Sequence, residues 1–103
     1  MDKIFKNETI IIPTIIQEEK TGEVLMLGYS NNMSFIKTKE KGFVWFFSRS
    51  RKKLWKKGKT SGNLLKVEKL MVDCDRDTLL IKVSLIGEAV CHNGDKSCFR
   101  ETL

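Results

Sequence analysis

Residues 66–86 decide the fold, and they read KVEKLMVDCDRDTLLIKVSLI. After the polar centre of this stretch, apolar side chains return at every second position, as on the buried face of a β-strand: Leu79, Ile81, Val83 and Leu85. We therefore expect a strand over Thr78–Ile86. The largely apolar segment Lys66–Val72 is predicted to be its antiparallel partner.

The polar centre of the stretch contains three carboxylates: Asp73, Asp75 and Asp77. In one unbroken strand they would all point to the same face as the apolar side chains that follow, and burying unpaired carboxylates is costly. A tight turn at residues 75–77 avoids this cost, and aspartate is a favoured turn residue. In that turn the carboxylates can converge, while Cys74, which has the opposite parity, points elsewhere.

Two strands are predicted before this hairpin. The β-branched segment Ile10–Ile16 is typical of a strand, and Pro13 should confine it to a sheet edge or a bulge, because proline donates no hydrogen bond to a neighbouring strand. The polar segment Glu18–Gly22 ends in glycine and suits a hairpin connection into a second strand at Val24–Leu27.

One helix and one further strand complete the predicted elements. Asn31 or Asn32 can cap a short helix over about Met33–Lys41, which Gly42 would end. The segment Phe43–Ser48 is apolar on both faces, and we therefore expect it to be a central strand.

Composition limits the architecture and the partners. A chain of 103 residues fits one domain, and the elements above predict an α+β fold over residues 1–103, predominantly β, with a barrel-like sheet and one short helix. The net charge of +6 favours an anionic partner, which could be a nucleic acid, a phosphorylated metabolite or a membrane surface. Charge alone does not choose among them.

The cysteines and the N-terminus indicate a compartment. Three cysteines is an odd number, which argues against a closed disulfide framework. Residues 1–6 contain no long apolar run of the kind that secretory signals carry. No apolar stretch approaches the roughly 20 residues that a membrane helix needs. We therefore expect a cytoplasmic protein, in which thiols serve more often as metal ligands or nucleophiles than in disulfides.

All the cysteines and the only histidine lie between positions 74 and 98. Cys74, Cys91 and Cys98 can supply three thiolates, and three protein ligands plus water is the pattern of catalytic zinc. His92 could be a fourth ligand or a proton shuttle. The alternative is that these cysteines are small buried apolar residues. The sequence contains no Cys-x-x-Cys pair, which argues against a zinc ribbon and a thioredoxin-type redox site.

The carboxylates of the aspartates suit a different metal ion from the thiolates of the cysteines, which indicates a second metal site. Carboxylates favour Mg²⁺ and thiolates favour Zn²⁺, so Asp73, Asp75 and Asp77 are candidate magnesium ligands. The alternative is that these aspartates form only a solvated turn.

A basic stretch from Arg49 to Lys59 holds seven cations, no acid and Trp55. The loop Thr60-Ser61-Gly62-Asn63 follows and could add hydroxyl and backbone N–H donors. Arginine and lysine grip phosphate, but this pattern also suits a nucleic-acid groove or an edge strand protected by lysines. A hydrolytic metal site in the same small domain favours a phosphorylated small molecule. The candidate contacts are Arg49, Arg51, Trp55, Lys57, Thr60, Ser61, Gly62 and Asn63.

Ordered motifs across most of the chain resemble those of the phosphoribosyl-AMP cyclohydrolases, enzymes of histidine biosynthesis. The motifs are Ser48-Arg49-Ser50-Arg51, Leu54-Trp55, Lys57-Gly58, Thr60-Ser61-Gly62-Asn63, Asp73-Cys74-Asp75-Arg76-Asp77, Cys91-His92-x-Gly94 and Ser97-Cys98-Phe99. Two positions depart from the family pattern, because Ser30 stands where methionine is expected and Lys59 where glutamate is usual.

The resemblance implies hydrolytic opening of the adenine ring of 1-(5-phosphoribosyl)-AMP at its N1–C6 bond. It also implies an intertwined homodimer, with one zinc ion and one magnesium ion per subunit and a zinc site shared between subunits. The zinc ligands would be Cys74, Cys91 and Cys98, and the magnesium ligands Asp73, Asp75 and Asp77. The chemistry of ring opening agrees with a catalytic role for His92, which could shuttle a proton as the ring nitrogen leaves. The substrate would be a phosphorylated nucleotide rather than nucleic acid or membrane. The main rival is a small metal-stabilised nucleic-acid-binding protein, which the basic stretch would also suit.

Overall fold

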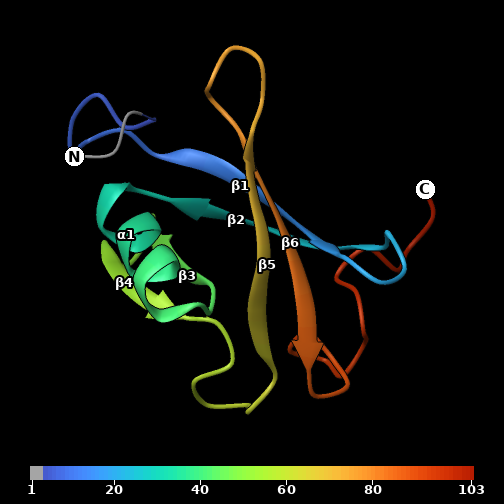
Figure 1. Cartoon of the computed structure of the whole chain (residues 1–103). Coiled ribbons are helices and arrows are strands. Elements are labelled where there is room, and N and C mark those ends of the chain that lie inside the picture. The colour runs from blue at the N-terminus through green and yellow to red at the C-terminus, as the bar shows by residue number, and fades with distance from the viewer. Residues whose placement is uncertain (1–3) are drawn as a thin grey trace.

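A computed structural model of the chain describes residues 4–103, and the first three residues of the predicted domain lie outside the described part (Figure 1). Its elements, in chain order, are β1 (Ile12–Glu18), β2 (Val24–Ser30), α1 (Asn32–Lys41), β3 (Trp45–Ser48), β4 (Lys53–Lys56), β5 (Leu64–Val72) and β6 (Leu79–Ile86). Four strands form one sheet in the order β2-β1-β6-β5, and β3 pairs with β4 in a separate ribbon. The mostly-β prediction with one short helix is confirmed.

The β5–β6 hairpin forms as predicted. The two strands are antiparallel, and their last pair joins Val72 to Leu79. The turn is closed by the Asp73 N–H, which donates to the Thr78 oxygen at 3.0 Å, and Arg76 takes a left-handed φ of 64° in it. Leu79, Ile81 and Val83 are buried, so the period-two face does enter the core.

The position of β1 contradicts the prediction for Pro13. β1 lies between β2 and β6, antiparallel to the first and parallel to the second, so it is neither an edge strand nor bulged at the proline. Parallel pairing to β6 starts at Thr14, so Pro13 is opposed only by Tyr29 of β2. The missing proline N–H therefore interrupts no ladder with β6, and a central strand tolerates it.

The segment Phe43–Ser48 is not a central strand, which corrects a second prediction. Only Trp45–Ser48 forms a strand, and its partner is β4 alone. Its apolar outer face is covered by other elements: α1 contacts β3, and the Lys37 ammonium lies 4.9 Å from the Trp45 ring centroid. Two covered faces on a two-stranded ribbon give the same apolar pattern as a central strand.

The ribbon is tied to the main sheet at Val44, and within residues 4–103 the sheet does not close into a barrel. The Val44 N–H donates to the Leu65 oxygen at 3.0 Å, and its oxygen accepts the Lys57 N–H at 3.1 Å. The barrel-like prediction is therefore wrong in detail, because one isolated bridge, between Phe43 and Lys66, joins the segment before β3 to β5 in place of a continuous ladder.

Helix α1 begins and ends at the predicted caps. The Asn31 side chain accepts the Ser34 N–H, and the Ser34 hydroxyl in turn accepts the Asn31 N–H, which forms a capping box. Gly42 ends the helix with a φ of 77°. A larger core cluster, including Ile16, Phe46 and Ile81, lies between the sheet and the ribbon. No helix in the described part of the chain is long and apolar enough to cross a membrane.

Candidate active site

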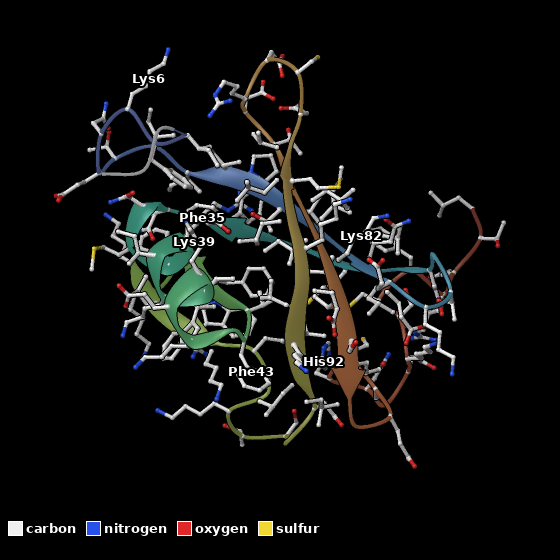
Figure 2. All side chains as sticks on the ribbon, viewed as in Figure 1. Lys6, Phe35, Lys39, Phe43, Lys82 and His92 are labelled. Carbon is white, nitrogen blue, oxygen red and sulfur yellow. The ribbon has the colours of Figure 1, made fainter. Side chains whose placement is uncertain are left out.

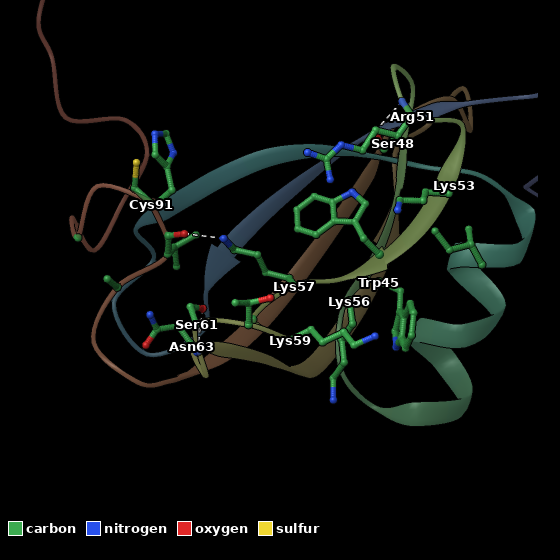
Figure 3. Close-up of a pocket in the computed structure, with 18 residues that line it drawn as sticks. Trp45, Ser48, Arg51, Lys53, Lys56, Lys57, Lys59, Ser61, Asn63 and Cys91 are labelled. Carbon is green, nitrogen blue, oxygen red and sulfur yellow. Dashed lines mark hydrogen bonds between the residues drawn. The ribbon is translucent and has the colours of Figure 1, made fainter.

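A pocket of about 780 Å³ lies between the β3–β4 ribbon and the segment that follows β6 (Figure 3). It brings together predicted site residues from two distant parts of the sequence: Arg51, Trp55, Lys57, Thr60, Ser61, Asn63, Cys91 and His92. These residues are contributed by the β3–β4 turn, by β4, by the turn after it and by the loop after β6. Sequence reasoning proposed the basic stretch and the Cys-His pair separately, and the pocket joins them.

The pocket wall depends on the turn between β4 and β5. Gly58 has a φ of 87°, and a Cβ at this position would overlap the Asn63 backbone oxygen, so a side chain cannot be accommodated. The Gly62 N–H donates to the Gly58 oxygen at 2.8 Å and closes the turn. The Asn63 side-chain oxygen accepts the Glu88 N–H at 3.3 Å, which joins the turn to the end of β6.

The pocket lining is cationic. Among the residues that line it are an arginine, four lysines and a histidine, and none is Asp or Glu: Arg51, Lys53, Lys56, Lys57, Lys59 and His92. The list of predicted contacts omitted Lys53, Lys56 and Lys59, although they belong to the same basic stretch. Lys53 and Lys56 are the first and last residues of β4, and Lys59 lies in the turn that follows it. A site of this charge suits an anionic ligand such as a phosphate ester.

Two predicted contacts lie elsewhere. The Arg49 guanidinium carbon sits 3.6 Å from the centre of the Tyr29 ring, in a second, shallower hollow of about 550 Å³. This hollow shares Ser48 and Trp55 with the pocket. Gly62 does not line the pocket, and its φ of 81° gives it a role in the turn.

The loop after β6 and the C-terminal segment place Cys91 beside Cys98. Desolvation raises the pKa of the Cys98 thiol above its ordinary value, the neighbouring Cys91 thiol raises this pKa further, and the Lys57 ammonium offsets part of the rise. Cys98 is fixed to β2, because its N–H donates to the Leu25 oxygen at 2.8 Å.

Two residues for which the sequence predicted no role hold the Cys98 segment in place. The Ser97 hydroxyl is buried and donates to the Val24 oxygen at 2.8 Å. The Lys96 ammonium lies 2.7 Å from the Glu18 carboxylate and 3.2 Å from that of Glu23. Their positions next to Cys98 were the only available signal, since the two bonds join residues 78 and 73 positions apart in the chain.

The three aspartates converge at the tip of the β5–β6 hairpin, as expected. One ligand oxygen from each of Asp73, Asp75 and Asp77 lies within 4.8 Å of the others, and all three residues are exposed. Desolvation acts to raise the pKa of Asp73, but backbone N–H groups of Asp77 and Thr78 donate to its carboxylate and hold that pKa below its ordinary value. Hydrogen bonds with the Asp77 and Asp73 carboxyls raise the pKa of Asp75. The turn thus concentrates negative charge at one point.

Cys74 lies at this same hairpin tip, away from the other two cysteines. Strand β6 separates the hairpin tip from the loop that carries Cys91. The strand has eight residues, each of which advances it by roughly 3.4 Å. The tip and the His92 loop accordingly lie at opposite ends of the strand (Figures 1 and 2). Within one chain, Cys74 cannot join Cys91 and Cys98 around a single ion.

Comparison with known proteins gives the family. A family model described as phosphoribosyl-AMP cyclohydrolase matches residues 26–100. A phosphoribosyl-AMP cyclohydrolase from Listeria innocua is 58% identical over 89 residues, which cover 86% of this chain and 84% of the relative. One from Clostridium botulinum is 57% identical over 99 residues, which cover 96% of this chain and 89% of the relative.

The chain belongs to the phosphoribosyl-AMP cyclohydrolase family. This membership confirms the resemblance found in the motifs and the prediction that the protein is a hydrolase. The matched region of this cyclohydrolase chain contains the pocket, the acidic hairpin and every cysteine. The identity of any metal ion and the oligomeric state rest on separate arguments.

Proposed function

We propose that the protein opens the adenine ring of 1-(5-phosphoribosyl)-AMP by hydrolysis of the N1–C6 bond, a step of L-histidine biosynthesis. The product would be the phosphoribosylformimino aminoimidazole carboxamide ribotide. The observation that carries the proposal is the pocket, which combines a cationic wall with Cys91 and His92. Family membership supports the same reaction. The free thiols and this biosynthetic role favour a cytoplasmic location.

The cationic wall suits the two 5′-phosphates of this substrate. Arg51 can grip a phosphate with two parallel hydrogen bonds, and the hydroxyls of Thr60 and Ser61 can add neutral donors. Asn63 and the Gly62 turn complete that side of the wall. Trp55 is more than a third exposed and offers a ring face for the base. Arg49, in the adjoining hollow, is a candidate contact for the second phosphate.

The donor set fits zinc only if two chains contribute to it. Cys91 and Cys98 are neighbours, whereas Cys74 lies at the far end of β6. We propose a homodimer with one zinc ion per subunit, in which the third thiolate, Cys74, comes from the partner. Charge complementarity supports this arrangement, because an acidic hairpin tip from one chain would approach the cationic pocket of the other.

The proposed chemistry divides into attack and proton transfer. When bound, zinc lowers the pKa of a coordinated water to about 7 and so supplies hydroxide at neutral pH. Alkylation at N1 makes the adenine ring cationic and its C6 electrophilic, so water adds there. His92 lines the pocket and is exposed, and it can give a proton to the ring nitrogen as the N1–C6 bond breaks.

The carboxylate cluster fits one magnesium ion per subunit, because oxygen ligands are the ones Mg²⁺ takes. The raised pKa of Asp75 and the lowered pKa of Asp73 show carboxyls that repel one another and share hydrogen bonds. A bound cation would offset the repulsion between these carboxylates, which favours its binding. It could also partly neutralise a substrate phosphate.

Asp75→Asn is expected to abolish the stabilising effect of magnesium on the melting temperature. A carboxyl with a raised folded-state pKa stabilises the fold below its unfolded-state pKa, and this contribution is lost as the pH rises through the folded-state value. At neutral pH without magnesium, Asp75→Asn should therefore melt at or above the temperature of the unaltered protein. With magnesium, only the unaltered protein should gain melting temperature, as differential scanning fluorimetry would measure. An equal magnesium-dependent rise in both proteins would contradict the site.

The test of the proposed function is turnover of 1-(5-phosphoribosyl)-AMP by the purified protein, followed by ultraviolet absorbance. We expect ring opening that a zinc chelator abolishes and added zinc restores, because the attacking hydroxide depends on the ion. Absence of turnover with both metals supplied would overturn the proposal. A steep fall of generic RNA affinity with rising salt in the same preparation would then favour the nucleic-acid-binding alternative.

A further inference from the structure

Lys57 differs from the other cations of the pocket in where its charge is directed. Its Nζ donates to the backbone oxygen of Val90 at 2.6 Å, across 33 positions of sequence. Lys57 is half-buried, and Val90 is 2% exposed. In Figure 3 the Lys57 side chain extends toward the segment that carries Cys91, whereas the ends of Lys56 and Lys59 point away from it. The bond is short and charge-assisted, which places it among the stronger hydrogen bonds.

The Val90 oxygen belongs to the peptide unit that joins Val90 to Cys91, and this unit is held at both ends. Its oxygen accepts from Lys57, while its N–H, on Cys91, donates to the Asp95 oxygen at 3.0 Å. Because a peptide unit is planar, two fixed polar ends set its orientation. The two bonds thereby set the direction in which the Cys91 side chain leaves the backbone. They also help to set the position of the next residue, His92.

Lys57 is itself well anchored for this task. Its backbone N–H donates to the Val44 oxygen at 3.1 Å, so it is tied to the point where the ribbon meets the main sheet. Val44 is fully buried in the larger core cluster. The Lys57 side chain thus links the loop after β6 to this anchored point, next to Val90, whose own side chain packs in the same core cluster.

We infer that Lys57 is a positioning residue of this active site. It fixes the Val90–Cys91 peptide so that the Cys91 thiol and the His92 imidazole face the pocket, and it leaves the substrate phosphates to the other cations. This inference rests on the proposed function and replaces the phosphate-binding role that the sequence predicted for Lys57. A buried carbonyl oxygen requires a hydrogen-bond donor. Removal of the Lys57 ammonium should therefore loosen the loop after β6 before it affects the rest of the fold.

The experiment compares Lys57→Met with the unaltered protein, and uses Lys69→Met as a matched control. Lys69 is an exposed lysine on β5 that does not line the pocket. Amide hydrogen exchange would be measured over residues 90–94, AMP affinity by calorimetry, and kcat and KM with 1-(5-phosphoribosyl)-AMP. AMP serves as a fragment of the substrate that does not react.

We expect Lys57→Met to raise exchange over residues 90–94 by about 10-fold or more, with β1 and β6 unchanged, because local opening is governed by local contacts. A catalytic group displaced by about 1 Å can cost on the order of 100-fold in rate, so kcat should fall by that order while KM and AMP affinity stay within about twofold. Lys69→Met should match the unaltered protein in every measurement.

A second variant, Lys57→Gln, keeps an N–H donor and removes the charge. It should recover part of the exchange protection and of kcat that Lys57→Met loses, whereas a neutral amide would not restore a phosphate contact that needs charge. If Lys57→Met does not fold, Lys57→Gln undergoes the same measurements.

Unchanged exchange over residues 90–94 in the folded variant would overturn the inference, as would a loss of AMP affinity of about 10-fold or more, the effect of losing one charge-assisted contact. Failure of the unaltered protein to open the adenine ring is a different result. It would overturn the proposed function, while the exchange measurement would still test whether Lys57 holds the Val90–Cys91 peptide in place.

Discussion

Mixing Cys74→Ala protein with Cys91→Ala protein, each inactive alone, is expected to restore ring-opening activity. If each site takes Cys74 from one subunit and Cys91 from the other, a mixed dimer carries one intact site and one site that lacks both thiols. Random exchange of subunits makes half of the dimers mixed, so the recovered activity should approach about a quarter of that of unaltered protein. Unfolding and refolding the mixture would allow the exchange, and ultraviolet-monitored turnover would measure it.

The pairing of variants supplies its own control. Cys91→Ala mixed with Cys98→Ala should stay inactive, because those two cysteines are neighbours and would come from the same subunit of each site. In such a mixed dimer, both sites lack one thiol. Recovery in this control, or its absence in the Cys74 mixture with dimers shown to exchange, would contradict the shared site.

His92→Ala is expected to lower kcat by roughly 10²–10⁴-fold, which is the usual contribution of a general acid or base. His92 is exposed within the pocket, and AMP affinity and zinc content should stay near those of the unaltered protein. Steady-state kinetics, calorimetry and metal analysis measure the three quantities.

Asn93→Ala is the matched control for this substitution, because Asn93 is exposed in the same loop and does not line the pocket. It should retain kcat. A loss of zinc from His92→Ala would identify the imidazole as a fourth ligand instead of a proton carrier. An unchanged kcat would remove His92 from the mechanism altogether.

The sequence predicted the β5–β6 hairpin because two local signals agree there. The period-two pattern ending at Leu85 and the aspartate-rich turn both indicate a reversal between Val72 and Leu79. The helix caps at Asn31 and Gly42 were predictable for the same reason, since capping depends on residues a few positions apart.

The errors at Pro13 and Phe43–Ser48 have a common cause. Both predictions concerned which strands become neighbours, and this depends on contacts between distant parts of the chain. A proline can lie in a central strand if its own position faces a gap in the ladder, and an apolar ribbon can be covered by a helix. The apolar pattern of a strand indicates how many of its faces are buried. It does not indicate which elements bury them.

For the candidate site, residue types were predictable and distances were not. The motifs indicated thiolates, carboxylates and a cationic stretch, and the pocket joins the last of these to Cys91 and His92. That Cys74 lies a full strand away from Cys91, that Arg49 stacks on Tyr29, and that Lys57 is bonded to Val90 all depend on tertiary placement.

The parallel pairing of β1 with β6 also bears on how the chain is made. Within residues 4–103, the first strand, β1, and the last, β6, lie side by side in the middle of the main sheet. While the ribosome is still synthesising the chain, β1 has only β2 as a partner, and the sheet centre stays open until β6 has emerged. Such long-range closure is slow and leaves apolar strands exposed in the meantime. Nascent chains that stop before β6 should therefore depend on chaperones, and full-length chains should acquire protease resistance late, in a single step.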